Sequence, residues 1–422
     1  MYVHIDIDSF FASAERAINP QLDGLPIAVG SRSNLEIFNK QRTNIKVMND
    51  NSGAFVAPVF YSPKLKNFES YFVDTLKGQK KIRGIITTAS YEARARGVKT
   101  AMPIAQALSL CPDLIVLPSN YHFYHQLSKR LTHFIKARIP KVEQFSIDEY
   151  FGDVSGWIHE DDLYSFAIAL RDEILKEFNL PVSIGIAPAK WIAKVATEKA
   201  KPFGVYQVQD TMTFIEKIPI EKFPGIGKGF QRRLKSHNIH TLGEVVNNKA
   251  LFYRWKKPGI SLYNRIVGIE NSLNKQDAPR KSIGISRTFD PIHDTNEMRR
   301  RVVIMARHII YLVYKQQVNP TTYYLSIRYQ YGIKKKCSRT LHRIFSESLF
   351  KNELIAMYNE IAFKNAGAIK LTLNVSNFTQ QQHETLSLFE FETDLEKAKL
   401  SQNIQRLRER FGIDIVKSGV EL

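Results

Sequence analysis

The first eleven residues constrain the fold more than any other stretch of the chain. Apolar and polar residues alternate from Tyr2 to Asp8, which predicts a buried strand that ends in two carboxylates, Asp6 and Asp8. Ser9 and the apolar residues after it predict a helix that begins at once, with Ser9 as its N-terminal cap. The chain is therefore expected to begin with a strand and a helix that meet at a pair of acidic side chains.

The composition excludes several classes of protein. At about 150 residues per domain, 422 residues predict roughly three domains, and an apolar content of 44% is enough for several cores. There are only two cysteines, Cys111 and Cys337, which excludes a disulfide scaffold. They lie far apart in sequence and outside any metal-ligand spacing, which fits a reducing compartment. No segment reaches the roughly 18–20 apolar residues of a membrane span, and the acidic start is unlike a signal peptide. These features predict a soluble, cytoplasmic protein.

The net charge of +19 is distributed unevenly along the chain. Residues 209–280 carry 13 basic and 6 acidic side chains, and residues 281–380 carry 16 and 6. Residues 1–208 are nearly balanced, with 25 and 21. A basic excess of this size indicates a polyanionic partner, either nucleic acid or an acidic membrane surface. A generically basic proteome is the alternative explanation.

Two acidic motifs suggest a metal site. The first is Asp6-Ile7-Asp8, and the second is Ser146-Ile147-Asp148-Glu149. Carboxylates from two separate strands can converge on a divalent cation, and hard oxygen ligands suit Mg²⁺. Two such ions, roughly 3.5–4 Å apart, clamp the attacking and leaving oxygens of an in-line phosphoryl displacement. Spacing alone does not show that the motifs meet in space, and strand-end aspartates commonly just cap turns.

Three further segments carry groups suited to a triphosphate. The free N–H groups at the start of the helix after Ser9 face any phosphate held by the carboxylates. Tyr91 and Arg94 lie three apart on one predicted helix face, and Lys201 supplies a point charge. By composition alone, Arg94 and Lys201 are ordinary solvated charges, and Phe10 is a core residue.

The turn Pro224-Gly225-Ile226-Gly227 lies between two short predicted helices in a basic region. Its glycines let the backbone approach a phosphate closely, and the helix that follows adds N–H donors. This turn resembles a helix-hairpin-helix element, which grips DNA without reading sequence. The runs Arg299–Arg301 and Lys334–Lys336 are also expected to contact the DNA backbone.

Taken together and in order, these motifs resemble the Y-family translesion DNA polymerases, close to the DNA polymerase IV and UmuC-like bacterial branch. The resemblance covers nearly the whole chain and is strongest at residues 4–15, 89–103, 145–156 and 183–204. It implies an α+β multidomain fold of the right-hand polymerase type. The implied parts are a palm with fingers in 1–208 (fingers about 21–120), a helix-hairpin-helix thumb in 209–275, an α/β little finger in 282–376 and a tail in 377–422.

The resemblance also implies roles for single residues. Asp6, Asp148 and Glu149 are the expected catalytic, metal-binding carboxylates, with the Ile7 carbonyl assisting, and they hold two Mg²⁺ ions for which Mn²⁺ can substitute. Phe11 is the expected steric gate, which leaves no room for a ribose 2′-OH. The remaining implied contacts are Phe10, Phe11, Tyr91, Arg94 and Lys201 to the nucleotide, and Gly225, Gly227, Lys228 and Arg287 to DNA.

The tail carries a segment similar to the sliding-clamp-binding peptide of bacterial relatives. Here the peptide is Leu386-Ser387-Leu388-Phe389, with Leu386, Leu388 and Phe389 as the expected apolar anchors. Thr385 stands where the family usually has Gln. An ordinary packed strand is the alternative for this segment.

Two departures from the family pattern stand out. Between Gly30 and Ile85 the chain has about 40 more residues than the usual compact fingers segment, and loops of that length are uncommon without a role. This insertion, about residues 31–84 with a net charge of +6, is expected to alter lesion choice, bind DNA, or have no catalytic role. Tyr150 follows the catalytic glutamate, where relatives usually have a small residue.

The function implied is template-directed, low-fidelity translesion DNA synthesis on primer-template DNA with dNTPs. The enzyme is expected to be monomeric, without a membrane partner, and associated with the nucleoid when on DNA. One rival is a catalytically impaired relative that binds DNA and the clamp as an accessory protein. A second rival is a nucleotide cyclase, which also places two metal-binding carboxylates on a palm-like sheet, but the basic later segments have no purpose there.

Overall fold

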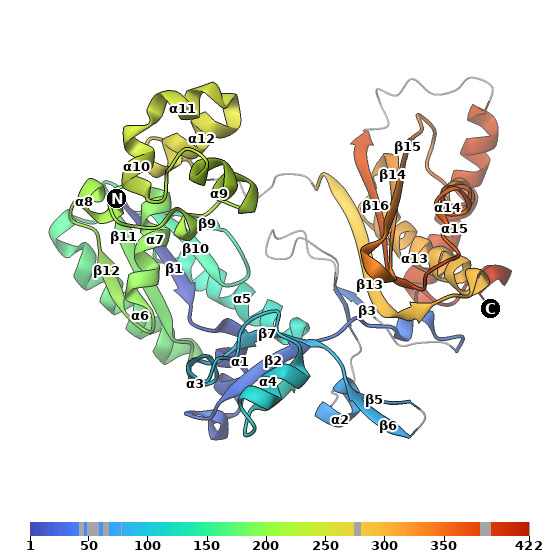
Figure 1. The fold of residues 1–422 in the computed structure, drawn as a ribbon, viewed down its shortest axis with the longest axis horizontal. Helices are drawn as coiled ribbons and strands as arrows, with labels where there is room; N and C mark the ends of the chain where they lie inside the picture. Colours follow the sequence, from blue (N-terminus) through green and yellow to red (C-terminus); the bar gives the residue numbers. More distant parts are fainter. Residues whose placement is uncertain are drawn as a thin grey trace. The chain divides into compact units, whose positions relative to one another are not determined.

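The computed structural model describes residues 1–41, 46–48, 59–61, 67–76, 78–273, 280–379 and 390–421. The chain divides into two compact units, shown as ribbons in Figure 1. The first contains residues 1–31 and 67–273 of the described chain, and the second contains residues 32–41 and 280–421 with two short strands, β3 (Lys46–Met48) and β4 (Val59–Tyr61). In these described ranges, no helix combines the length and apolar character needed to cross a bilayer.

A five-stranded sheet with the order β12-β11-β1-β10-β9 forms the centre of the first unit. Its central strand β1 (Tyr2–Ile7) confirms the strand predicted at the N-terminus. Helices α6 (Leu163–Phe178) and α7 (Lys190–Ala200) pack on the sheet. The other strands are β9 (Lys141–Gln144), β10 (Glu149–Asp153), β11 (Val182–Ala187) and β12 (Val205–Gln207).

The close packing of α7 on β11 depends on a glycine. A Cβ atom built on Gly185 lies 2.2 Å from the carbonyl oxygen of Ala193 in the helix, which no side chain can tolerate. All six residues of β11 are buried, so the strand is covered on both faces. This contact sets the distance between α7 and the central strand, and thereby places the lysines of α7 beside the acidic end of β1.

A second, three-stranded sheet of the first unit has the order β7-β2-β8. Helix α1 (Phe10–Ile18) lies against both β2 and β7, and helix α2 (Phe68–Phe72) contributes the buried Phe72 to the same core. The other elements of this part are β2 (Ile27–Ser31), β5 (Val73–Leu76), β6 (Gln79–Ile82), β7 (Ile85–Ala89), α3 (Tyr91–Ala95), α4 (Ile104–Leu110), β8 (Ile115–Pro118) and α5 (Tyr121–Lys136).

The basic segment after residue 208 is helical, as predicted. Its helices are short because capping residues interrupt them: Asp210 caps the first, and Thr241 with Glu244 forms a capping box at the third. They share a core with α7 that contains Trp255. The five helices are α8 (Thr211–Ile215), α9 (Lys228–Lys235), α10 (Leu242–Asn247), α11 (Lys249–Arg254) and α12 (Lys256–Ile266).

The second unit is an antiparallel sheet covered by helices on one face (Figure 1). The strand order is β13-β16-β14-β15, and helices α13 and α14 pack on the sheet while α15 packs on those helices. The elements are β13 (Ser282–Ile292), α13 (Thr295–Lys315), β14 (Asn319–Tyr329), β15 (Lys334–Thr340), α14 (Glu347–Ile361), β16 (Ala368–Thr379) and α15 (Phe391–Phe411).

The predicted insertion is divided between the two units. Residues 32–41 belong to the second unit, where Ile37 and Phe38 are buried in the core formed by β13–β16, α13 and α14. Residues 67–84 belong to the first unit and include α2 and the β5-β6 hairpin. The insertion is therefore neither a single domain nor a single loop.

Candidate active site

Backbone pairing brings the two predicted acidic motifs together. Strand β1 pairs with β10 so that Asp6 lies opposite Glu149. The Ile7 amide donates to the Asp148 carbonyl at 3.0 Å, which fixes the residue before Glu149 at the same point. The acidic ends of two strands that are 140 residues apart in sequence thus lie side by side, as the predicted metal site requires.

Asp8 has a structural part in this site. Its carboxylate accepts hydrogen bonds from the Tyr91 hydroxyl at 2.9 Å, the Ser183 hydroxyl at 2.9 Å and the Phe203 amide at 2.8 Å. These donors come from α3, β11 and the turn after α7. Asp8 therefore positions the segments that carry Tyr91 and Lys201 around Asp6.

Two lysines of the α7 segment neutralise the carboxylates. Lys201 Nζ lies 3.1 Å from Asp6 Oδ1 and 2.9 Å from Glu198 Oε1. Lys194 forms an ion pair with Glu149. Lys201 was predicted from the sequence, whereas Lys194 was not. The spacing of Lys194 and Lys201, seven residues apart and so on one helix face, is the signal that could have identified Lys194.

The crowding of negative charge raises the pKa of two of the carboxyl groups. Burial is the largest cause for Asp6, and repulsion from Asp148 and Glu149 adds to it, so that its pKa rises to about 8 despite the opposing charge of Lys201. Burial, together with Glu149, also raises the pKa of Asp148, although the Ser146 hydroxyl opposes the shift. A site of this kind favours additional positive charge.

The donor set fits a hard divalent cation. All three side chains are carboxylates, which are the ligands that Mg²⁺ prefers. Among the described residues, however, no three acidic, histidine or cysteine side chains form a ready-made metal cluster. Lys194 and Lys201 instead hold the carboxylates of Glu149 and Asp6. The ion pairs involve one oxygen of each carboxylate, Oε1 of Glu149 and Oδ1 of Asp6.

The two phenylalanines at the start of α1 differ in their surroundings. Phe10 is only 2% exposed, so its ring belongs to the core. Phe11 is partly exposed, and its ring stacks on Tyr124 with centroids 4.5 Å apart and the planes at 16°. Tyr121 meets the Phe11 ring edge-on at 5.7 Å. The Phe11 ring is thus held rigidly against two tyrosines of α5, one strand-to-helix turn after Asp6.

Tyr91 and Arg94 lie together on α3, as predicted. The Arg94 guanidinium lies over the Tyr91 ring, 5.0 Å from its centroid, and Arg94 Nε donates to the Ala89 carbonyl at 2.9 Å. Since the Tyr91 hydroxyl is bound to Asp8, this pair is fixed relative to the end of β1. Arg94 is exposed, so its guanidinium group is accessible to an anionic ligand.

Tyr150 points away from Glu149 because side chains alternate along β10. Its ring is fully buried, and its hydroxyl lies 3.1 Å from both the Ser128 carbonyl and the Thr132 hydroxyl of α5. The bulky residue after Glu149 is therefore part of the packing between the sheet and α5.

We expect Tyr150→Phe to lower the free energy of unfolding by about 1–2 kcal/mol, because the Ser128 and Thr132 groups lose a buried partner. Thermal denaturation measures this loss, and nucleotide incorporation by the variant is expected to match that of the parent chain. A large loss of incorporation without a loss of stability contradicts a purely structural role for Tyr150.

The predicted hairpin turn lies at the start of α9. Gly225, Gly227 and Lys228 are all exposed, and a Cβ atom on Gly227 would meet nothing within 4 Å. Gly225 has φ +96°, which favours glycine, and Arg265 Nη2 donates to the adjacent Pro224 carbonyl at 3.0 Å. The turn thus presents bare backbone at the N-terminus of a basic helix.

Arg287 does not share the exposed setting of those residues. Strand alternation places it on the side of β13 that carries the buried Ile283, Ile285 and Phe289. Its Nε donates to the Asn34 carbonyl at 3.1 Å, and burial lowers its pKa to about 10. Within the second unit, this arginine binds the insertion segment, and its predicted contact with DNA stays a prediction.

The opposite face of that sheet is polar and basic. Pairing aligns two cross-strand rows on it, which sequence reasoning identified only in part through Lys334–Lys336. The rows are Thr288, Lys370, Arg328 and Lys334, and beside it Ser286, Thr372, Ser326 and Lys336. Hydroxyl and ammonium groups in such rows suit the phosphates of a nucleic-acid backbone.

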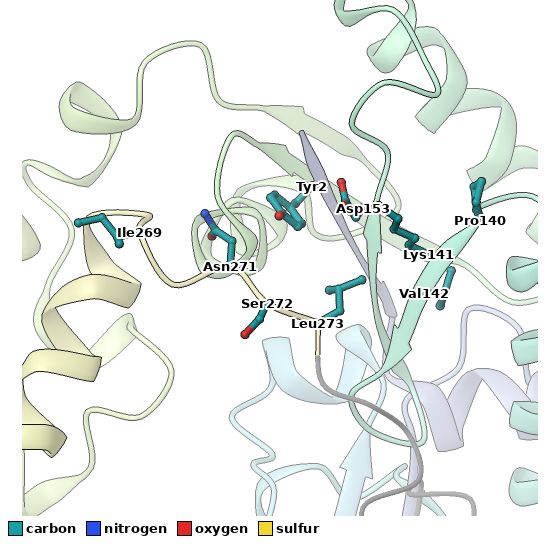
Figure 2. A pocket seen from close by; sticks show the side chains of 9 residues that line it. All are labelled: Tyr2, Pro140, Lys141, Val142, Asp153, Ile269, Asn271, Ser272 and Leu273. Atoms are coloured by element: carbon teal, nitrogen blue, oxygen red, sulfur yellow. Dashed lines mark ion pairs between the residues drawn. The ribbon is translucent and has the colours of Figure 1, made fainter.

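A pocket of about 530 Å³ lies at the other end of β1 (Figure 2). Tyr2 and Asp153 line it from the sheet, and Asn271 to Leu273 line it from the segment after the thumb-like helices. Asn271 Oδ1 accepts from the Lys190 amide at 3.0 Å, and Lys190 Nζ donates to the Ser272 carbonyl at 3.2 Å. The predicted site residues do not line this pocket.

The proposed clamp-binding residues Leu386, Leu388 and Phe389 lie outside the described residues. The flanking elements are described: β16 ends at Thr379, and Asp394 near the start of α15 accepts from Arg343 Nη2 at 2.7 Å. Both flanks therefore belong to the second unit.

Three family models match consecutive parts of the chain. Residues 5–198 match the impB/mucB/samB family, residues 208–239 match its helix-hairpin-helix motif, and residues 280–388 match its C-terminal domain. The second match covers the turn and helix α9 described above.

Curated proteins and solved structures agree with these matches. DNA polymerase IV of Enterobacter sp. strain 638 is 32% identical over 301 residues, which cover 70% of this chain and 72% of the relative. DNA polymerase IV 1 of Halalkalibacterium halodurans is 29% identical over 99% of this chain and 92% of its own. A Y-family DNA polymerase chimera of Dbh and Dpo4 has a similar fold, with a TM-score of 0.64 and 21% identity over 89% of this chain and 98% of that chain.

Proposed function

Because this chain belongs to the impB/mucB/samB family and is a DNA-directed DNA polymerase of the bacterial Y family, we propose that it extends primers across damaged template bases with low fidelity. The observation that carries the proposal is the convergence of Asp6, Asp148 and Glu149 at the end of β1. DNA and deoxynucleotides are the substrates of such an enzyme.

The carboxylates and the residues around them have different roles in the proposed nucleotidyl transfer. We propose that Asp6, Asp148, Glu149 and the Ile7 carbonyl hold two Mg²⁺ ions, with Mn²⁺ as a substitute, which supply Lewis acidity for attack and departure. Arg94 and Lys201 bind the triphosphate and neutralise charge that develops on it. Phe11 supports the sugar, and the α1 N-terminus offers N–H groups to phosphate.

Lys201 plays two parts in this proposal. In the structure its ammonium group binds Asp6 at 3.1 Å. When the carboxylate gains another cationic partner, Lys201 is free to turn to the triphosphate, and Lys194 can leave Glu149 in the same way. Substrate binding thus exchanges internal ion pairs for external ones, which keeps the buried charges balanced throughout.

The grip on DNA comes from two basic surfaces in this proposal. One is the exposed turn Gly225–Gly227 with Lys228, and the other is the pair of polar rows on the open face of β13–β16. Both offer backbone amides, hydroxyls or ammonium groups, which fix the duplex without selecting its sequence. Binding that does not depend on sequence suits an enzyme that copies damaged DNA.

We expect Lys228→Ala to weaken primer-template binding by about threefold at moderate salt, whatever the sequence, and to reduce the salt slope of log K by about one. Fluorescence anisotropy across a salt series measures both. Lys176→Ala, which removes an exposed lysine of α6, is the matched control and is expected to change neither. Equal effects of the two substitutions contradict a specific contact at the hairpin.

The test of the function is primer extension with purified protein, Mg²⁺ and dNTPs on undamaged and abasic templates. Extension past the abasic site supports translesion synthesis, whereas arrest at every lesion tested counts against it. Folded protein that binds primer-template but adds no nucleotide supports the alternative, an accessory protein of the same fold.

We also propose a sliding clamp as partner, through Leu386, Leu388 and Phe389, for an enzyme that acts as a monomer in the cytoplasm. The support is the similarity of this peptide to clamp-binding segments and its place between two elements anchored in the second unit.

A further inference from the structure

The insertion contributes a segment to the second unit that is bound along its whole length. We define residues 33–40 as the strap. Its two buried side chains are Ile37, which is 3% exposed, and Phe38, which is 4% exposed. Phe38 meets Phe289 of β13 edge-on at 6.4 Å, and the guanidinium of Arg301 lies 4.4 Å from the Phe38 ring centroid. Two apolar anchors therefore hold the strap in the core.

Main-chain groups of the strap are recognised as well. Its carbonyl groups accept from Arg287 at Asn34 (3.1 Å), from Arg300 at Phe38 (2.8 Å) and from Lys417 at Lys40 (2.8 Å). The Thr288 amide of β13 donates to Ser33 Oγ at 3.1 Å. Three basic side chains and one strand edge thus bind eight residues that lie 253 to 377 positions away in sequence.

The chain enters the strap directly from the first unit. Ser31 ends β2 in the three-stranded sheet, and Ser33 is already bound to Thr288 in the second unit. A single residue lies between them, so a docked strap adds a very short attachment of the second unit. The chain also passes between the two units between residues 41 and 67, and again before β13.

We propose that the strap is a clasp, which attaches the second unit to the chain that leaves β2 and stays docked while DNA is bound. The inference rests on the proposed function, in which the second unit grips the duplex. An additional attachment raises the effective concentration of that unit at DNA already held by the first. Release of the clasp therefore acts on dissociation from DNA more than on nucleotide chemistry.

The test compares dissociation from two primer-templates, one with a duplex too short to engage the second unit and one with a long duplex. In the clasp variant, Ile37→Ala with Phe38→Ala, we expect about tenfold faster dissociation from the long duplex and no change on the short one. Ser33→Ala, which keeps the core intact and loses one hydrogen bond, is expected to act in the same direction but less.

Ile361→Ala is the matched control, because Ile361 belongs to the same core cluster but lies at the end of α14. This substitution loosens the core but leaves the strap docked, so the rate of dissociation from the long duplex is expected to be unchanged. Hydrogen exchange at residues 33–40 verifies release of the strap in the clasp variant. The proposal is overturned if the strap is released but the rate of dissociation from the long duplex is unchanged. It is also overturned if the clasp variant dissociates faster from both duplexes to the same extent.

A further variant separates failure of the clasp from failure of the proposed DNA grip. Lys334→Ala with Lys336→Ala removes two ammonium groups from the open face of the sheet. If this variant also dissociates normally from the long duplex, the second unit does not grip DNA and the proposed function is wrong at that point. If it dissociates faster while the clasp variant does not, the clasp alone is overturned.

Discussion

Replacing Asp148 and Glu149 together by alanine is expected to reduce Mg²⁺-dependent primer extension by roughly 10³-fold or more. Glu149 is the first residue of β10 and lies opposite Asp6, and Asp148 directly precedes it. Single-turnover incorporation of one dNTP measures the loss. The fold is expected to survive the double substitution. Burial raises the pKa of the Asp148 carboxyl group, so replacing this side chain by alanine removes a group whose charged form is costly to bury.

The matched control is Asp161→Ala with Asp162→Ala, which removes two exposed carboxylates of the same unit. The net charge changes equally, so a general electrostatic effect on DNA binding appears in both variants. Only the Asp148 and Glu149 variant is expected to lose chemistry while it still binds primer-template. Retained extension in that variant, at more than a few per cent of the parent rate, contradicts the assignment of the carboxylates.

Phe11→Val is expected to raise ribonucleotide incorporation relative to deoxynucleotide incorporation by about 10²-fold or more. In the parent chain, the Phe11 ring cannot move aside for a 2′-OH because Tyr124 stacks behind it at 4.5 Å and Tyr121 closes its edge. Overpacking against a ring held in this way costs about 1–3 kcal/mol. The smaller valine removes the obstruction and leaves the tyrosines in place.

The ratio of kcat/KM for a ribonucleotide to that for its deoxy counterpart measures the effect. Phe11→Tyr keeps the ring and is expected to keep the exclusion, which separates ring size from any other change at the position. Extension with deoxynucleotides is expected to persist in both variants. An unchanged ratio in the valine variant contradicts the steric gate.

Local patterns predicted the parts of the site that depend on neighbouring residues. Alternation identified β1, and the carboxylates at its end followed from the same pattern. The pairing of Asp6 with Glu149 was not accessible, because register is set by long-range contacts that no window of sequence contains. Only the resemblance to a family indicated that Asp6, Asp148 and Glu149 belong to one site.

The three hydrogen-bond donors to Asp8 could not be predicted from the sequence for the same reason. Tyr91, Ser183 and Phe203 come from three elements, and only the assembled fold shows that they share one carboxylate. The surroundings of Arg287 were not predicted from the sequence either. The resemblance implied a contact with DNA, which stays a prediction, and alternation along β13 turns Arg287 to the side that holds the strap.

The discontinuous core of the second unit has a consequence for biosynthesis. Ile37 and Phe38 are made early, but the strands and helices that bury them are made only after residue 280. At about 5–20 residues per second, two apolar side chains wait on the order of tens of seconds for their partners. During that interval the nascent chain exposes an apolar segment, so folding of the second unit is expected to depend on chaperones.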